Sequence, residues 1–190
     1  MNVLMLGPQG SGKGTQAKKI SEAYEIPHIA TGDLYRAAIT AGTDLGRLVA
    51  PLLVAGELVP DEITIPLIRE KVLEADRGFV LDGYPRNLVQ AEALDDLLEE
   101  IARPLSVVLL LELADDTARE RLTKRAALEG RADDQPEAIE RRLRDYHEKT
   151  EPVVDHYLTT GKIVKMHAER PIDAVWAEIE NTLEQVQARA

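Results

Sequence analysis

The segment Gly7–Thr15 (GPQGSGKGT) combines the residue types that hold a phosphate group. Its glycines allow a tight turn whose N–H groups point inward, and a helix starting here directs the positive end of its dipole at the same point. Lys13 adds a positive charge, and Thr15 supplies a hydroxyl on the magnesium side. The strict pattern has Ser or Thr directly after the lysine, where this chain has Gly14. A glycine-rich turn without a ligand is the alternative interpretation.

Two predicted helices carry arginine on the face that should be buried. Ala118, Leu122 and Arg125 share one helical stripe, and Arg142 lies on the apolar stripe of a later helix. A buried guanidinium group without a partner is costly, so these side chains either pair with carboxylates or line a cleft that binds an anion. A single arginine would more often be a surface side chain or a structural ion pair, but several beside a phosphate loop favour the anion site. The arginines concerned are Arg121, Arg125, Arg131 and Arg142.

A further cluster follows the apolar run Phe79–Leu81. Asp82 stands at the end of the predicted strand, and a turn containing Gly83 and Pro85 leads to Arg86. An acidic residue at a strand end beside a phosphate loop commonly anchors the magnesium shell, so Asp82 is the candidate on the metal side. A turn or helix cap is its alternative role. Arg86 leaves the same strand end and can bind a second phosphate.

Short apolar runs alternate with longer segments of helical periodicity. Continuous apolar runs are typical of strands covered on both faces, and strands alternating with helices predict a parallel sheet with right-handed crossovers. We therefore predict the α/β class, a three-layer α/β/α domain with ligands at the carboxyl ends of the strands. The predicted strands are Val3–Leu6, His28–Ile29, Phe79–Leu81, Ser106–Leu111 and Ile163–Met166. The predicted helices are Lys13–Tyr24, Leu34–Ala41, Leu45–Ala55, Ile63–Ala75, Leu88–Ile101, Asp116–Arg125, Pro136–Tyr157 and Ile172–Val186.

Two segments interrupt this alternation. Residues 31–60 contain helical patterns without a strand, which predicts an insertion standing beside the sheet. Residues 125–134 are short and charged and contain glycine, which predicts a small flap between two helices. Both adjoin strand carboxyl ends, where the phosphate loop opens, so both are candidates for moving parts. Pro66 and Pro152 lie inside predicted helices, where we expect a kink or a break.

Composition limits the possible partners. With 190 residues and 44% hydrophobic content, the chain can bury one substantial core as a single domain. The net charge of -11 argues against nucleic acid or an anionic membrane as a partner, so an anionic ligand needs a local positive cluster. Without cysteine, disulfides and thiolate zinc sites are excluded, and the histidines show no close metal-ligand spacing. No signal peptide or long apolar run is visible, so we expect a cytoplasmic protein.

Taken together, these motifs resemble those of the short-lid adenylate kinases, a family of nucleoside monophosphate kinases. The match spans most of the chain, and the glycine after Lys13 belongs to this family's version of the loop. The matching segments are GPQGSGKGT, TGDLYR (31–36), GELVPDE (56–62), DGYPR (82–86), Gln90, RLTKR (121–125), RADD (131–134) and Arg142.

The resemblance implies that ATP and AMP are the substrates, with Mg²⁺ accompanying ATP, and that phosphoryl transfer gives two ADP. The residues expected at ATP are Gly10, Ser11, Gly12, Lys13, Gly14, Thr15, Arg121, Arg125 and Arg170. Those expected at AMP are Thr31, Gly32, Arg36, Glu57, Leu58, Val59, Gly83, Tyr84, Pro85, Arg86, Gln90, Arg131 and Arg142. The expected catalytic residues are Lys13, Arg86, Arg125, Arg131 and Arg142. The residues expected to hold Mg²⁺, through water, are Thr15 and Asp82.

The resemblance also implies how a single kinase domain is divided. Only a few residues separate Arg125 from Arg131, so the zinc-binding lid of long-lid relatives is not expected. The family is usually monomeric, which predicts a monomer here. The expected divisions are a five-stranded core (1–29, 60–124 and 135–190), an AMP-binding insertion (30–59) and a short lid (125–134).

Two other functions stay open from the sequence. One is a kinase of the same fold acting on UMP or CMP; Thr31 and Gln90 favour adenine, because a glutamine amide can meet the donor and acceptor edge of that base. The other is a non-enzymatic nucleotide-binding switch. A second group of phosphate-binding residues, Arg36 and Arg86, argues against the switch, as does the lack of the Asn-Lys-x-Asp pattern that reads guanine.

Overall fold

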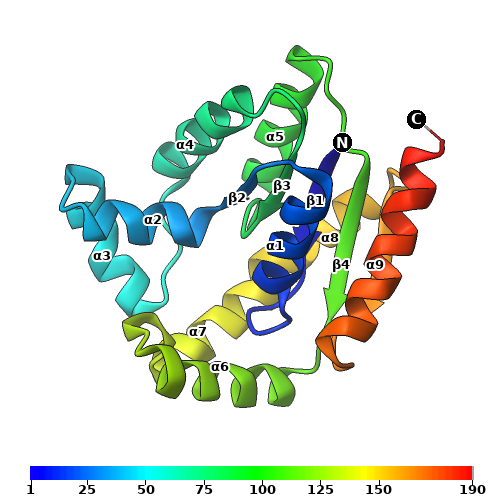
Figure 1. Cartoon of the computed structure of the whole chain (residues 1–190). Coiled ribbons are helices and arrows are strands. Elements are labelled where there is room, and N and C mark those ends of the chain that lie inside the picture. The colour runs from blue at the N-terminus through cyan, green and yellow to red at the C-terminus, as the bar shows by residue number, and fades with distance from the viewer. Residues whose placement is uncertain (190) are drawn as a thin grey trace.

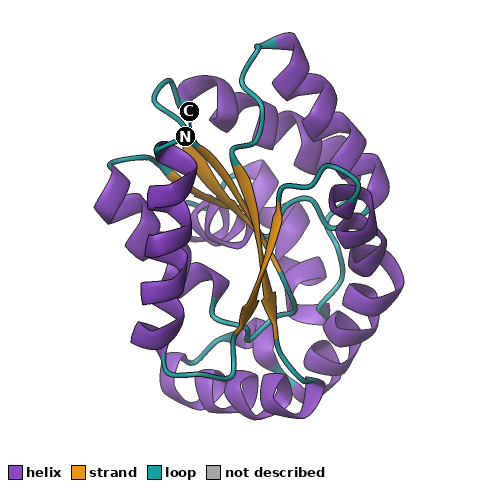
Figure 2. Cartoon of the chain, turned by 90° about the vertical axis from the view of Figure 1, so that its right-hand side faces the viewer, coloured by secondary structure: helices purple, strands orange, loops and turns teal. Residues whose placement is uncertain are grey.

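A twisted sheet of parallel strands forms the centre of the molecule, and helices pack on both of its faces (Figures 1 and 2). The computed structural model describes residues 1–189. The strands are β1 (Asn2–Leu6), β2 (His28–Ala30), β3 (Phe79–Asp82), β4 (Val107–Glu112) and β5 (Ile163–His167). Their order is β2-β3-β1-β4-β5, and every neighbouring pair is parallel. The predicted α/β class and five-stranded sheet are confirmed.

The helices alternate with these strands, apart from two stretches. The α-helices are α1 (Lys13–Tyr24), α2 (Thr31–Thr40), α3 (Asp44–Ala55), α4 (Asp61–Glu74), α5 (Leu88–Glu100), α6 (Asp115–Glu129), α7 (Pro136–Asp145), α8 (Glu151–Leu158) and α9 (Ile172–Gln187). Of these, α2 to α4 lie between β2 and β3, and α6 to α8 lie between β4 and β5. A 3₁₀ turn, η1 (Ala132–Asp134), precedes α7, and a π-helical turn, η2 (Tyr146–Thr150), precedes α8.

The strands are apolar along their length because both faces of the sheet are covered. In β1, Leu4 and Leu6 pack with residues of α4, α5 and α8, while Val3 and Met5 pack with residues of α1 and α9. Each of these four side chains is at most 2% exposed. Complete burial of such a side chain stabilises the fold by about 1.5–3 kcal/mol relative to an exposed position. A polar residue at any of them would be costly, which explains why the apolar runs predict the strands well.

Helices α2 and α3 form a lobe that stands beside the sheet (Figure 1). The hydroxyl of Thr43 caps α3 by accepting a hydrogen bond from the Gly46 N–H at 3.1 Å. The predicted helical insertion without a strand in residues 31–60 is confirmed. The lobe has a small core of its own, made by Tyr35, Val49, Leu53 and Val59.

Two helix boundaries that bear on the site differ from the prediction. Helix α2 begins at Thr31 rather than Leu34, and its N-cap position, Ala30, provides no side-chain cap that would mark this start. Helix α6 continues to Glu129, so the first half of the predicted flap is helical. The residues before Glu129 are strong helix formers, and the helix ends only at Gly130, which adopts a left-handed conformation.

The predicted helix 136–157 is helical throughout, but the π-helical turn η2 interrupts the α-helical hydrogen bonding between α7 and α8. Pro152 lies in the first turn of α8, where its missing N–H costs no helical hydrogen bond, so the expected break near this proline is confirmed. The break expected at Pro66 is not found, since α4 runs through it. Pro66 and Glu62 are both exposed, so water can bind the carbonyl that the proline leaves free.

His147 in η2 bridges the first turns of two helices. Its Nδ1 lies 2.7 Å from Glu151 of α8, and its Nε2 lies 3.0 Å from Asp115 of α6. Hydrogen bonds to Glu151 and Asp115 raise the pKa of His147 above its usual value of 6.5. The protonated ring can donate from both nitrogens, so its contribution to stability is complete below pH 6.5 and is lost as the pH rises through the raised pKa.

We therefore expect His147→Gln to lower the melting temperature at pH 6 and to have a smaller effect at pH 9. The bridge is largely exposed, so the expected difference is small, at most about a few degrees. Thermal unfolding of both proteins across this pH range measures it. An equal loss at both pH values would show that His147 contributes packing rather than charge.

Within residues 1–189, no single helix is long and apolar enough to cross a bilayer. Taken together, α2 and α3 reach the required length and composition, but they are bent by 120° relative to each other.

Candidate functional site

One cleft of about 940 Å³ opens where the carboxyl ends of the strands meet the lobe α2–α3 and the helices α6 and α7. The segments after β1, β2 and β3 contribute the phosphate loop, Thr31 and the turn from Gly83 to Arg86. Every residue predicted from the sequence to bind a nucleotide or Mg²⁺ lines this cleft. Its size is at the upper end of the usual range for a ligand pocket, so it has room for a large ligand or for two.

The phosphate loop leads from β1 into α1, as its sequence predicts. Gly12 is the N-cap of α1 and adopts a left-handed conformation, with φ of 90°. Nζ of Lys13 donates hydrogen bonds to the carbonyl oxygens of Gly7 and Pro8, both at 2.8 Å, so the ammonium lies against its own loop. Oγ of Ser11 is buried and has no hydrogen-bond partner in the described part of the chain. A phosphate oxygen at this point would satisfy that hydroxyl.

Burial lowers the pKa of Lys13 to about 8, and the charges of Arg86 and Arg125 act in the same direction against the opposing effect of Asp82. Part of the residue's surface reaches the cleft, but protein atoms surround its ammonium group. A positive charge held out of bulk water interacts more strongly with an anion that enters the site.

Asp82 is the last residue of β3, and its side chain is 15% exposed at the floor of the cleft. Burial would raise the pKa of Asp82, but the neighbouring His28 and Lys13 outweigh it and hold this pKa below its usual value. Nε2 of His28 lies 3.5 Å from Oδ2 of Asp82, a contact too poorly aligned for a well-formed hydrogen bond. The carboxylate therefore stays charged. A Cβ added to Gly14 would lie 3.4 Å from Oδ2 of Asp82, so this glycine brings the start of α1 close to the carboxylate.

The turn after β3 is fastened to the start of α2. The hydroxyl of Thr31 donates a hydrogen bond to the carbonyl of Gly83 at 2.9 Å, and Nε of Arg86 donates to the same carbonyl at 2.7 Å. Gly83 has a φ of 77°, and a Cβ there would lie 2.7 Å from the Thr31 hydroxyl, so only glycine fits. Burial and the nearby Arg142 lower the pKa of Arg86. The guanidinium is thus crowded with other cations, as expected for a polyanion site.

Arg125, Arg131 and Arg142 both line the cleft and pair with carboxylates, whereas Arg121 lines the cleft and donates only to backbone carbonyls. Nε and Nη2 of Arg125 bind Asp134 at 2.6 and 2.8 Å. Arg142 donates to Asp134 at 3.1 Å and to Asp133 at 2.9 Å. Nε of Arg131 lies 3.5 Å from Asp133.

Asp133 and Asp134 are functional candidates that the sequence reasoning missed. The side chain of Asp134 has no exposed surface, and it joins α6 to the last turn of α7 through Arg125 and Arg142. Asp133 also lies 3.7 Å from Arg36 of the lobe. The available signal was two adjacent acids, two and three residues after Arg131, between helices that carry several arginines.

Arg121 and Arg170 both contact the end of β5 or the segment that follows it, and Arg121 also contacts the phosphate loop. Nη1 of Arg121 donates to the carbonyl of Gly10, and Nη2 donates to that of Glu169, both at 3.4 Å. Arg170 follows β5 and binds the carbonyl of His167 at 3.2 Å. Both residues line the same cleft as Arg86.

Comparison with known proteins agrees with this geometry. The family model described as adenylate kinase matches residues 5–162. The adenylate kinase of Stenotrophomonas maltophilia (strain K279a) is 45% identical over 181 residues, which covers 94% of this chain and 97% of the relative. That of Xanthomonas euvesicatoria pv. vesicatoria (strain 85-10) is 43% identical over 185 residues, covering 96% and 99%. This chain belongs to the adenylate kinase family.

As an adenylate kinase, the protein transfers a phosphoryl group reversibly from ATP to AMP and forms two ADP. The reaction brings two polyanions together, so the enzyme must neutralise charge at both nucleotides. The cleft meets this demand although the chain as a whole has a net charge of -11. The positively charged side chains of the cleft come from elements far apart in the sequence. The sheet, the lobe α2–α3 and the helices α6 and α7 together bring them to one place.

The residues around the phosphate loop fit the Mg²⁺ that adenylate kinases use with ATP. The described residues contain no group of three or more His, Asp or Glu side chains able to enclose a metal ion. Mg²⁺ does not need such a cage, because it keeps several waters and binds one or two protein ligands together with substrate phosphates. The charged carboxylate of Asp82 and the hydroxyl of Thr15 both line the cleft beside Lys13.

Proposed function

We propose that ATP and AMP bind end to end in this cleft, and that the residues divide between them as follows. Gly10 to Thr15, Arg121, Arg125 and the loop at Arg170 hold ATP. The acceptor AMP is held by Thr31, Gly32, Arg36, Glu57, Leu58, Val59, Gly83, Tyr84, Pro85, Arg86 and Gln90, with Arg131 and Arg142. The observation that carries this proposal is the single cleft, large enough for two ligands, that is lined both by the phosphate loop with Arg121 and by Arg36 and Arg86 from other elements.

In this arrangement, the AMP phosphate attacks the terminal phosphoryl group of ATP in line. That phosphate is already ionised at neutral pH, so no general base is required, and positioning with electrostatic stabilisation suffices. Lys13, Arg86, Arg125, Arg131 and Arg142 are the proposed catalytic residues. Arginine can bind two phosphoryl oxygens at once and keeps its charge at any relevant pH, which suits it to a group in transfer.

Thr15 and Asp82 are the proposed residues on the Mg²⁺ side, and they act through bound water. The ion would supply further positive charge on the ATP phosphates. The charged state of Asp82 supports this assignment, because an acceptor-only carboxylate can orient the waters of a Mg²⁺ shell.

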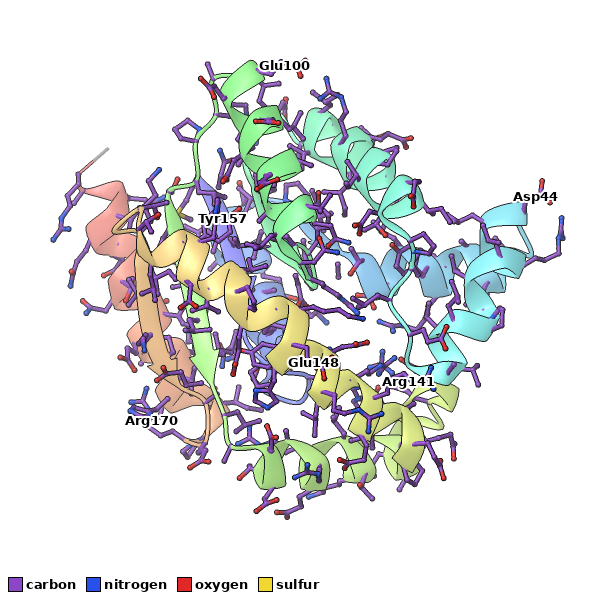
Figure 3. The ribbon with its side chains drawn as sticks, turned by 180° about the vertical axis from the view of Figure 1, so that it is seen from behind. Asp44, Glu100, Arg141, Glu148, Tyr157 and Arg170 are labelled. Carbon is purple, nitrogen blue, oxygen red and sulfur yellow. The ribbon has the colours of Figure 1, made fainter. Side chains whose placement is uncertain are left out.

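The lobe of residues 30–59 and the lid of residues 125–134 are the proposed moving parts around the core of residues 1–29, 60–124 and 135–190. Contacts between them support this role. Arg141 of α7, labelled in Figure 3, pairs with Glu57 at the end of the lobe, and Arg36 of the lobe lies 3.7 Å from Asp133 of the lid. Closure of both parts would exclude water, which would otherwise compete with AMP for the phosphoryl group.

We also propose that the acceptor is AMP rather than UMP or CMP. The protein would act as a monomer in the cytoplasm and balance the adenine nucleotides there. The family assignment supports AMP over a pyrimidine acceptor and over a non-enzymatic switch. Steady-state rates with AMP, CMP, UMP and GMP test the preference, and faster turnover with a pyrimidine would overturn it.

We expect Arg36→Ala to raise the KM for AMP by about tenfold or more and to leave the KM for ATP nearly unchanged. Arg121→Ala should raise the KM for ATP by a similar factor and leave the KM for AMP nearly unchanged. A hydrogen bond to a charged group contributes about 1.5–3 kcal/mol, which corresponds to this range. Initial rates measured with each substrate varied in turn give both constants.

The two variants serve as controls for each other, since each removes one guanidinium from the same cleft. If both substitutions raised the same KM, the division into two nucleotide compartments would be wrong. If purified protein formed no ADP from ATP and AMP despite tight binding of ATP, the catalytic proposal would fail.

A further inference from the structure

The side chain of Gln90 lies where the acceptor base is proposed to bind, and its amide is held on both sides. Gln90 is 2% exposed and lines the cleft from the first turn of α5. Its Oε1 accepts a hydrogen bond from the backbone N–H of Arg86 at 2.8 Å. Its Nε2 donates to Oδ1 of Asp61 at 2.7 Å.

These two partners determine which way the amide points. A backbone N–H can only donate, so it selects the oxygen of Gln90, while an ionised carboxylate can only accept, so it selects the nitrogen. Rotating the amide by half a turn would place two donors together and two acceptors together. The assignment of oxygen and nitrogen therefore follows from unambiguous neighbours.

A second amide reinforces Asp61 in its position. Oδ1 of Asn87 accepts from the backbone N–H of Gln90 at 2.9 Å and caps α5, which fixes the Asn87 amide. Its Nδ2 then donates to both oxygens of Asp61, at 3.1 and 3.2 Å. Asp61 thus receives hydrogen bonds from two amides and does not itself line the cleft.

After these contacts, Gln90 retains one amide hydrogen and one lone pair on its oxygen. A base that faces this edge must supply one acceptor and one donor, in that order. Adenine does so with N1 as acceptor and the 6-amino group as donor. Hypoxanthine and guanine present the reverse, because their N1 carries a hydrogen and their 6-oxygen accepts; both would need the amide to turn round.

We propose that Asp61 is a positioning residue that locks the orientation of the Gln90 amide, and that this lock makes the acceptor site select 6-amino over 6-oxo purine nucleotides. The proposal rests on the placement of the AMP base at Gln90 given above. Asp61 acts only through Gln90. This base selection is separate from the action of the arginines, which bind phosphate and cannot distinguish two purines.

The test compares AMP with IMP, which has the same size and the same phosphate but the reversed edge. The ratio of kcat/KM for AMP to that for IMP is measured in the wild type, Asp61→Ala and Asp61→Asn, together with the inhibition constant of IMP against AMP. We expect Asp61→Ala to lower the ratio by about tenfold or more, mainly because IMP improves. Asp61→Asn should lower it less, since an asparagine oxygen can still accept from Gln90. This isosteric variant also serves if the alanine variant folds poorly.

Glu62→Gln is the matched control. It removes one negative charge from the same turn of α4, but Glu62 is exposed. The ratio of kcat/KM for AMP to that for IMP in this variant should therefore equal that of the wild type. A merely structural role of Asp61 would lower the rates with AMP and IMP together and leave the ratio unchanged. That outcome would overturn the inference.

Gln90→Leu separates this inference from the proposal on which it rests. If Gln90→Leu leaves the ratio of AMP to IMP unchanged, the base does not lie against Gln90 and the placement of AMP is wrong. If Gln90→Leu abolishes the preference while Asp61→Ala retains it, the placement stands and the role of Asp61 is rejected.

Discussion

Arg142→Ala is expected to reduce turnover by at least about a hundredfold while the protein stays folded. An arginine that stabilises phosphoryl transfer contributes a rate factor of about 10³ to 10⁵ in related enzymes, or roughly 4 to 7 kcal/mol of barrier. Arg142 lies in the cleft beside Arg86, and its side chain is only 12% exposed. We expect a comparable loss for Arg125→Ala, which removes the second guanidinium bound to Asp134.

The fold should survive because the carboxylates keep other partners. Without Arg142, Asp134 retains Arg125, and Asp133 retains Arg131 and Arg36. A coupled assay of ADP formation gives kcat, and circular dichroism with thermal unfolding checks the structure. Arg144→Ala is the control, since Arg144 is exposed on the same helix. Turnover close to that of the wild type in Arg142→Ala would remove this residue from the catalytic group.

Asp134→Ala is expected to lower the free energy of unfolding by about 2–3 kcal/mol. Removing one partner of a buried ion pair costs about 3–5 kcal/mol when the remaining charge stays buried. Here Arg125 is 29% exposed and faces an open cleft, and Arg142 keeps Asp133, so water and the remaining carboxylate reduce the cost below that range. Equilibrium unfolding in urea measures the change.

The same substitution should also reduce turnover, although it makes the cleft more positive. Asp134 holds Arg125 and Arg142 in fixed relative positions, and losing that order should outweigh the gain in charge. Asp116→Ala is the control, because Asp116 makes only an exposed ion pair with Arg119, which contributes little to stability. An unchanged stability in Asp134→Ala would show that the arginines do not depend on this carboxylate.

Features that depend on local chemistry could be predicted from the sequence. The strands follow from continuous apolar runs, because only a sheet covered on both faces requires them. The phosphate loop follows from glycines and Lys13 between a strand and a helix. Helix boundaries were less predictable where no capping residue marks them, as at Thr31, or where good helix formers continue past the expected end, as at Glu129.

The pairing of charged side chains could not be predicted. The arginine stripes indicated an anion site or ion pairs, and the structure contains both in one place. Which carboxylate each arginine binds depends on the packing of α6 against α7, and no local pattern encodes that geometry. The role of Asp61 was missed for the same reason, since it lies 29 residues before Gln90 and appears in the sequence as an ordinary helix-start acid.

The sequence by itself determined the sheet and the phosphate loop, because periodicity and motif spacing act over short stretches of chain. The set of residues around the cleft came largely from the resemblance of the chain to the adenylate kinases. Only the tertiary structure decided how Asp133 and Asp134 hold the arginines, how Asp61 orients Gln90, and how the lobe meets the lid. These are contacts between elements distant in the sequence, and their hydrogen bonds and charges take effect only after the sheet has brought those elements together.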